Sequence, residues 1–143
     1  MSRAAGDRRT RLAYAATAAV VLLVGLGLQM FARTVAIDLA GSALYACLVG
    51  LVIATVRPSL PAWVVAVAGF GVSAAVELLQ LTGLPSRIVD AVPPLRLVFG
   101  SSFDPLDLAG YALGALLLLG LVPLVRAVAG RVVTAAGASR SDS

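Results

Sequence analysis

One carboxylate is the side chain most able to do chemistry in this 143-residue chain. Glu77 lies within residues 62–81, a stretch that is otherwise apolar or small, and no other charge occurs between Arg57 and Arg87. An acidic side chain at the centre of a membrane helix costs about 2.5–3.5 kcal/mol on insertion scales, so it should face protein or water and have a partner. Glu77 is therefore the best indication of a functional site.

Further polar residues are predicted to lie at the same depth as Glu77. Asp38 opens the predicted helix 37–56, and Asp107 falls in the first turn of the predicted helix 105–125. At 1.5 Å per residue, Glu77 lies about 6 Å from the end of its own helix. We therefore predict one polar site at one side of a membrane. Its candidate residues are Glu77, Gln80, Arg96, Asp107, Tyr111, Asp38 and Asp104.

Helix capping is the alternative interpretation of two of these carboxylates. Asp104 fits the N-cap of a helix whose first residue is Pro105. Asp107 then falls in the first turn, where a carboxylate complements the helix dipole. Its face also carries Tyr111, so capping and ligand binding both remain open for Asp107.

Glu77 and its neighbours also have structural alternatives. An ion pair between Glu77 and either Arg87 or Arg96 would close the helices against the following loop. Gln80 fits an interhelical hydrogen bond as well as a ligand contact. Arg96 equally fits an interfacial side chain that reaches lipid headgroups.

The composition of the chain indicates an integral membrane protein. Hydrophobic residues make up 60% and charged residues 13% of the sequence, against about 45–50% and 25% in average soluble domains. All 11 basic residues are Arg, which together with the Ala, Val, Leu and Gly bias suggests a bacterial genome rich in GC. We expect a lipid bilayer as the environment, and no nucleic-acid partner.

Several catalytic and metal sites are excluded by the residues that the chain lacks. It contains no His, and Cys47 is its only cysteine. A zinc-finger site, a Ser/His/Asp triad, a Cys/His pair and an intramolecular disulfide therefore cannot form within one chain. We expect no cofactor and no metal, and the balance favours a protein that is not an enzyme.

Four stretches are long enough to cross a hydrocarbon core of about 30 Å as helices. Short connections between the first three favour an antiparallel four-helix bundle, whereas residues 82–104 form a long loop that lies at the interface or re-enters the membrane. We expect a basic arm at 1–11, one membrane domain at 12–129 and a disordered tail at 130–143. The predicted helices span residues 12–31, 37–56, 62–81 and 105–125.

The distribution of Arg predicts the orientation. Eight of the 11 basic residues lie in the two termini and the second connection, and three in the first and third connections. Because cytoplasmic loops carry the excess of Arg, both termini are predicted to be cytoplasmic in a multi-pass protein of the bacterial inner membrane. The polar site would then face outward. The first group is Arg3, Arg8, Arg9, Arg11, Arg57, Arg126, Arg131 and Arg140; the second is Arg33, Arg87 and Arg96.

Small residues predict which helix faces pack together. Gly110 and Gly114 form a small-xxx-small pair on the face that carries Asp107. On residues 62–81, small residues precede Glu77 at intervals of three or four. The glycines are predicted to form a packing seam between helices.

The spaced polar residues also carry a resemblance. The pattern is Glu77-x-x-Gln80, then Arg96 in the loop, then Gly100-x-x-Phe103-x-x-x-Asp107-x-x-x-Tyr111-x-x-Gly114. It resembles the small bacterial membrane family called domain of unknown function 2809, over about residues 38–121. A looser likeness links it to VanZ-like proteins, which place an acidic residue and Gln in one helix and an Asp near the start of the next. The resemblance supports the location of the site and implies no reaction.

Three functional hypotheses follow. The first is a non-enzymatic protein whose outer polar cluster binds an envelope lipid, a cell-wall precursor or a partner protein. The second is a small homo-oligomeric transporter in which Glu77 exchanges protons. The third, least supported, is an intramembrane hydrolase in which Glu77 and Asp107 act as general acid and base.

Overall fold

A computed structural model describes residues 2–32, 34–82, 91–92, 94 and 103–141 of the chain. It contains four long helices: α1 (Ser2–Leu28), α2 (Val35–Val56), α3 (Ala62–Gln80) and α6 (Pro105–Ser141). The described residues form no β-strand. The prediction of an all-α chain with four long apolar helices is therefore confirmed.

The starts of the helices follow local signals in the sequence. The Thr34 hydroxyl caps α2 by accepting a hydrogen bond from the Ile37 N–H over 3.3 Å. α3 begins directly after Pro61 and α6 begins at Pro105, both as predicted. Pro105 suits the first position of α6, because its fixed φ favours the first helical turn and an N–H there would have no partner within the helix.

Two helices are longer than predicted. α1 begins at Ser2 and so includes the segment predicted as a basic arm. α6 continues to Ser141, past the predicted end at residue 125, and covers most of the segment predicted as a tail. Both extensions are rich in Ala and Arg, which favour helix once a neighbouring turn is formed. Hydropathy marks where a span ends, and it does not mark where the helix ends.

All four helices are long and apolar enough to cross a membrane. The candidate spans are Gly6–Leu28, Val35–Val56, Ala62–Gln80 and Pro105–Arg131. Large apolar side chains cover much of the surface of these spans, among them Leu23, Trp63 and Leu116, each more than 60% exposed. Exposure on this scale suits a surface that faces hydrocarbon rather than water. The chain is thus a multi-pass membrane protein.

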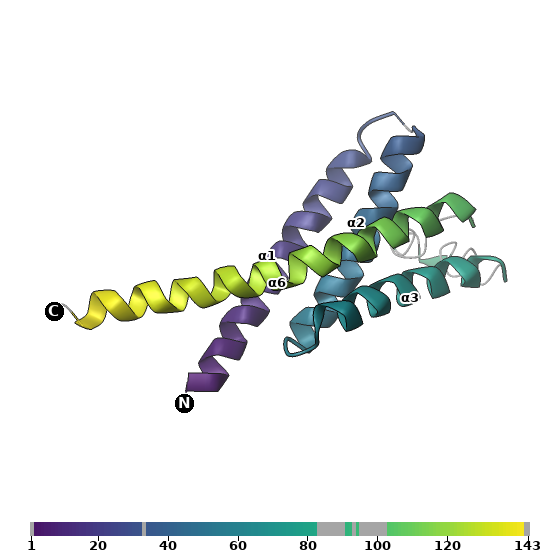
Figure 1. Cartoon of the computed structure of the whole chain (residues 1–143). Coiled ribbons are helices and arrows are strands. Elements are labelled where there is room, and N and C mark those ends of the chain that lie inside the picture. The colour runs from purple at the N-terminus through teal and green to yellow at the C-terminus, as the bar shows by residue number, and fades with distance from the viewer. Residues whose placement is uncertain (1, 33, 83–90, 93, 95–102, 142–143) are drawn as a thin grey trace.

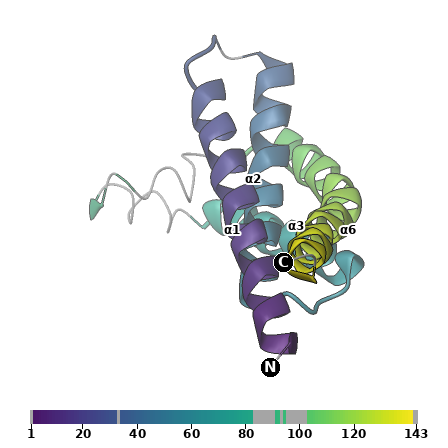
Figure 2. The same ribbon diagram turned by 90° about the vertical axis from the view of Figure 1, so that its left-hand side faces the viewer.

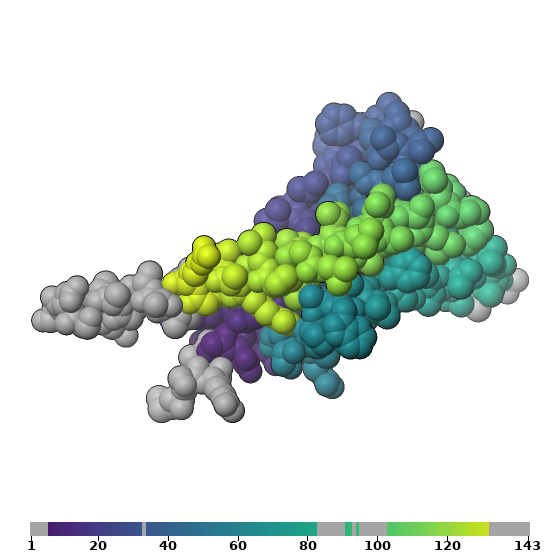
Figure 3. Space-filling view, viewed as in Figure 1, coloured from purple at the N-terminus to yellow at the C-terminus, as the bar shows by residue number. Residues whose placement is uncertain are grey.

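α2 and α6 are the central pair of helices. α2 packs against α1, α3 and α6, and α6 packs against the other three helices. In Figure 1, α6 crosses in front of α2 while α3 runs beside α6; Figure 2 shows α1 and α2 side by side after the chain turns back between them. The space-filling view shows α6 and α3 in contact along one face of the molecule (Figure 3). The end of α3 and the start of α6 therefore lie together.

Glycines form the predicted packing seam between α6 and α2. A Cβ atom on Gly110 would lie 2.5 Å from the Ser42 Cβ, and one on Gly114 would lie 2.9 Å from the Ala46 Cβ. Such distances leave no room for a side chain, so the two backbones approach closely only because these residues are glycines. The seam predicted at Gly110 and Gly114 is confirmed.

The centre of the fold is apolar. The Leu118 side chain is fully buried between α2 and α3, where it fills the space beside Gly50 and Gly69. Leu51 and Val122 are also fully buried in the same core. This layer separates the polar residues at the two ends of the helices.

Candidate functional site

Glu77 lies in the last turns of α3 and is only 1% exposed. Its Oε1 accepts a hydrogen bond of 2.6 Å from the Asp104 backbone N–H, and its Oε2 accepts one of 2.9 Å from the Tyr111 hydroxyl. Both donors belong to the start of α6 or to the residue before it. The carboxylate therefore joins α3 to the N-terminus of α6.

The start of α6 needs acceptors because its first N–H groups have no partners within the helix. Asp104 accepts a hydrogen bond from the Leu106 N–H at its own Oδ1, 2.9 Å away, so the predicted N-cap is confirmed. Glu77 accepts the hydrogen bond from the backbone N–H of the capping residue, Asp104. A carboxylate at this position also complements the positive end of the helix dipole.

Asp107 makes the equivalent connection between α6 and α2. Its Oδ1 accepts a hydrogen bond from the Ser42 hydroxyl. The same hydroxyl lies 2.9 Å from the Asp38 carbonyl oxygen one turn earlier in α2. Because a hydroxyl has one proton to donate, the two oxygens compete for it. Asp107 lies in the first turn of α6 as predicted, and it also binds a neighbouring helix, which capping alone does not require.

An aromatic contact completes the join between the three helices. The Tyr45 ring of α2 and the Tyr111 ring of α6 have centroids 6.0 Å apart and are tilted by 47°. This geometry is typical of a favourable aromatic pair. Tyr111, which is buried, thus contacts α2 with its ring and α3 with its hydroxyl. We call Ser42, Glu77, Asp104, Asp107 and Tyr111 the polar cluster.

The structure brings four of the seven predicted site residues together: Glu77, Asp104, Asp107 and Tyr111. Asp38 is half-buried in the first turn of α2 and reaches the cluster through its backbone carbonyl. Gln80 is half-buried near the end of α3. Arg96 lies outside the described residues, as does most of the loop 82–104. The ion pair predicted with Arg87 or Arg96 therefore stays a prediction.

Ser42 belongs to the site although the candidate residues did not include it. Its side chain is buried, and it gives Asp107 its contact on α2. The available signal was its spacing of four residues from Asp38, which places both on one stretch of the helix surface. A serine in a helix also bonds to the carbonyl four residues earlier, so the spacing did not identify its partner on α6.

Ser73 is the second buried hydroxyl near Glu77. It is 0% exposed and belongs to the same buried face of α3 as Gly69 and Glu77. Within the part of the chain that the structure describes, its Oγ has no hydrogen-bond partner. A buried polar group in this condition costs about 1–3 kcal/mol. The site therefore contains hydrogen-bonding capacity that the described protein groups do not use.

The described residues form neither a metal site nor an activated nucleophile. No group of three or more His, Cys, Asp or Glu among the described residues could hold a metal ion. Ser42 contacts a carboxylate and a carbonyl oxygen, and the chain has no His or Lys to activate it. What the polar cluster offers is an array of hydrogen-bond acceptors.

A separate polar contact lies at the other end of the helices. A terminal nitrogen of Arg126 on α6 donates to the Pro58 carbonyl over 2.9 Å and to the Leu60 carbonyl. Tyr14 of α1 is fully buried, lies beside the Arg126 guanidinium and donates to the Val122 carbonyl over 3.2 Å. Arg126 therefore fastens the α2–α3 connection to α6. In the sequence, Arg126 contributed only to the predicted orientation.

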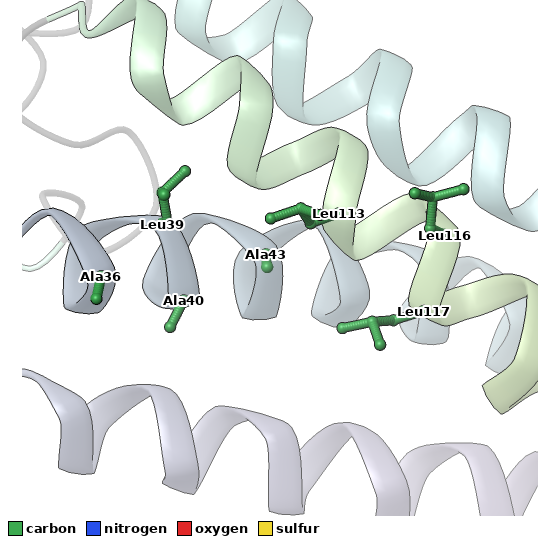
Figure 4. A pocket seen from close by; sticks show the side chains of 7 residues that line it. All are labelled: Ala36, Leu39, Ala40, Ala43, Leu113, Leu116 and Leu117. Carbon is green, nitrogen blue, oxygen red and sulfur yellow. The ribbon is translucent and has the colours of Figure 1, made fainter.

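Two apolar grooves run along the surface of α2. One, of about 500 Å³, lies between α2 and α6 and has only Ala and Leu side chains in its lining (Figure 4). The other, of about 290 Å³, lies between α2 and α3 and has Tyr45 as its one polar lining residue. Neither groove is lined by a residue of the polar cluster.

The fold and the cluster define a small helical membrane protein in which carboxylates and hydroxyls join three of the four spans. Residues 31–115, more than half of the chain, match the family described as protein of unknown function (DUF2809), and the chain belongs to that family. The resemblance to this family is confirmed, whereas the looser likeness to VanZ-like proteins stays a prediction. No curated protein and no solved structure matches the chain.

The matched region separates the two polar contacts. Every residue of the polar cluster lies within residues 31–115, whereas Tyr14 and Arg126 lie outside it. α1 and the part of α6 after Ala115 are likewise outside the match. The part of the chain that defines the family is thus the part that carries the polar cluster.

Proposed function

We propose that this protein is a non-enzymatic component of the bacterial inner membrane whose polar cluster binds the headgroup of an envelope lipid or a cell-wall precursor. One observation carries the proposal. Glu77 is buried, and the donors that it meets among the described residues are a backbone N–H and a tyrosine hydroxyl. A buried carboxylate is stable when paired or fully hydrogen-bonded, and neutral donors alone satisfy it incompletely.

The hydrogen-bonding capacity of the cluster supports a ligand. A carboxylate offers about four acceptor positions, and the described donors use each oxygen of Glu77 once. Ser73 adds a buried hydroxyl on the same face of α3. Because both side chains are buried, a polar headgroup would reach these atoms by parting the ends of α3 and α6. Asp104, which is exposed, lies at that end.

The orientation predicted from the Arg distribution places this end at the outer side of the membrane. Among the arginines counted for this prediction, Arg126 lies at the end of the helices opposite the polar cluster. Arg126 contacts the α2–α3 connection there. With both termini cytoplasmic, the cluster would meet lipids of the outer leaflet and precursors displayed on them.

A proton-coupled transporter is the second candidate. Burial of Glu77 in a span, with neutral donors, is the arrangement in which a carboxyl group exchanges a proton. A transport path must also connect the polar cluster to the opposite side of the membrane. Leu118, Leu51 and Val122 fill the core below the cluster, so one chain would have to open this layer or share a path with another copy in an oligomer.

The test compares Glu77→Gln and Asp107→Asn with the wild type, each purified in lipid bilayers. Envelope lipids and cell-wall precursors are added one at a time, and the shift in thermal unfolding temperature is measured. We expect at least one ligand to stabilise the wild type and to lose its effect in Glu77→Gln. Asp7→Asn, which changes an exposed carboxylate of α1, is the matched control. If both cluster variants unfold more easily and no ligand shifts the wild type, the cluster is structural and the proposal fails.

The transporter predicts a different result. Proton-coupled uptake into liposomes that Glu77→Gln abolishes would favour it over binding. A carboxylate hydrolase predicts cleavage of an added precursor, and loss of that cleavage in Asp107→Asn.

A further inference from the structure

We propose that the polar cluster binds its ligand through a primary ammonium group, as in an ethanolamine headgroup, with the nitrogen between Glu77 and Ser73. This inference rests on the proposed function and deepens it. It specifies the chemistry of the group that enters the site, which the binding proposal leaves open.

The described carboxylates at this end of the helices support a cationic ligand. Four carboxylates belong to the described residues of this end: Asp38, Glu77, Asp104 and Asp107. The Arg side chains that the structure describes are at positions 8, 9, 11, 57, 126 and 131, at the ends of the helices that meet around Arg126. Arg33, Arg87, Asp90 and Arg96, which the sequence assigns to the same side, lie outside the described residues. Among the described groups at this end, an anionic headgroup would meet like charge from the carboxylates, whereas an ammonium group would be attracted by them.

The hydrogen bonds of Glu77 and Ser73 support a ligand with N–H donors. The Asp104 N–H and the Tyr111 hydroxyl occupy one acceptor position on each oxygen of Glu77. The positions that no described donor occupies, and the oxygen of Ser73, can accept further bonds. A primary ammonium has three donors and no acceptor, so it complements an array of acceptors. A quaternary ammonium has the same charge without an N–H to donate.

The positions of Glu77 and Ser73 suit a single small group. They are four residues apart on one helix, which brings their Cβ atoms to about 5–6 Å from each other. Both side chains are buried on the same face of α3. One nitrogen between them can donate to both, and a direct hydrogen bond to a carboxylate is charge-assisted and therefore strong. Ser73, whose Oγ has no partner within the described residues, thereby gains a role.

The substitution Ser73→Ala separates this role from a structural one. It removes a buried hydroxyl that makes no hydrogen bond in the described structure. The ligand-free protein should therefore keep or gain thermal stability, because an unsatisfied buried group is lost. Binding of an ammonium headgroup should become weaker by about threefold in this variant, and by about tenfold or more in Glu77→Gln.

The experiment measures binding and thermal unfolding in bilayers of three compositions. Phosphatidylcholine bilayers are doped with phosphatidylethanolamine, with phosphatidylglycerol or with neither, and soluble ethanolamine is added in a fourth arm. We expect phosphatidylethanolamine to raise the unfolding temperature of the wild type and the other two lipids to have no such effect. An equal effect of soluble ethanolamine would identify the ammonium group alone as the ligand, and its absence would identify the lipid.

Two controls keep the outcomes distinct. Ser59→Ala changes an exposed serine in the α2–α3 connection and should leave the lipid effect unchanged. If phosphatidylglycerol or a cell-wall precursor stabilises the wild type through Glu77 and phosphatidylethanolamine does not, the ammonium inference is overturned while the binding function survives. If no lipid, precursor or amine has an effect that depends on Glu77, both proposals fail. Loss of ligand-free stability in Ser73→Ala would also overturn the assigned role of Ser73.

Discussion

The hydroxyl of Tyr111 on α6 donates a hydrogen bond to the carboxylate of Glu77 on α3 across 2.9 Å. Both residues are buried. The bond therefore connects two spans through buried side chains, where a hydrogen bond is stronger than one exposed to water. The Tyr111 ring also packs against Tyr45 of α2, so the Tyr111 side chain of α6 contacts both α2 and α3.

Tyr111→Phe should destabilise the protein while it leaves the packing of the ring unchanged. The substitution removes one donor from a buried carboxylate, which costs about 1–3 kcal/mol. Unfolding in mixed lipid and detergent should occur at lower denaturant concentration. Thr55→Val is the control, because the Thr55 hydroxyl bonds only to the Leu51 carbonyl of its own helix in the described contacts. Equal effects of the two variants would contradict an interhelical role for the Tyr111 hydroxyl.

Gly114→Ala should loosen the seam between α2 and α6. The added Cβ would meet the Ala43 carbonyl oxygen and would lie 2.9 Å from the Ala46 Cβ. Overpacking of this kind costs about 1–3 kcal/mol, because the helices must separate. Steric-trapping or denaturant unfolding in bilayers measures the change.

Gly120→Ala is the matched control on the same helix. Nothing lies within 4 Å of the position that its Cβ would take. It should be neutral, or stabilising by up to about 1 kcal/mol through the higher helix propensity of alanine. A loss of stability in Gly120→Ala as large as that in Gly114→Ala would show that the seam is not the cause.

The fold was predictable because a bilayer imposes a strong requirement on sequence. Each span needs about 20 apolar residues, and only one backbone conformation satisfies its own hydrogen bonds there. Asp104 and Pro105 likewise predicted the start of α6, since capping acts within a few residues. Glu77 was identified because a charge in such a stretch is rare.

The partners within the site were less predictable. The contact between Ser42 and Asp107 depends on the rotation and tilt of α2 against α6, which short polar intervals do not determine. The partners of Arg126 were even harder to predict from the sequence. Its acceptors are the backbone carbonyls of Pro58 and Leu60, and every residue has such a carbonyl. A contact between a side chain and the backbone of another segment requires no particular residue type at the acceptor, so the sequence contains no pattern that predicts it.

Arg126→Gln should destabilise the protein although Arg126 lies far from the polar cluster. The guanidinium donates to two carbonyls of the α2–α3 connection and lies beside the buried Tyr14 hydroxyl. Loss of charged donors from buried acceptors costs about 1–3 kcal/mol. Arg131→Gln, which changes an exposed arginine one turn and a half later, should change stability little.

A double-mutant cycle with Tyr14→Phe tests whether Arg126 and Tyr14 act together. Residues in one hydrogen-bond network show coupling of about 0.5–3 kcal/mol, so the double variant should lose less than the sum of the single losses. Headgroup binding at the polar cluster should be unchanged in both, because the apolar core around Leu118 separates the two ends. Strict additivity would show that the two side chains are independent.

The predicted orientation is tested by reporters placed in the connections. A reporter that is active only outside the cytoplasm, inserted within residues 82–104, should be active, because that connection carries the minority of the arginines and adjoins the polar cluster. The same reporter after Ser143 or at the α2–α3 connection near Ser59 should be inactive. Each insertion is checked with a second reporter that works only in the cytoplasm. The reverse pattern would place Glu77 and Asp107 on the cytoplasmic side, and the ligand would then have to come from the inner leaflet.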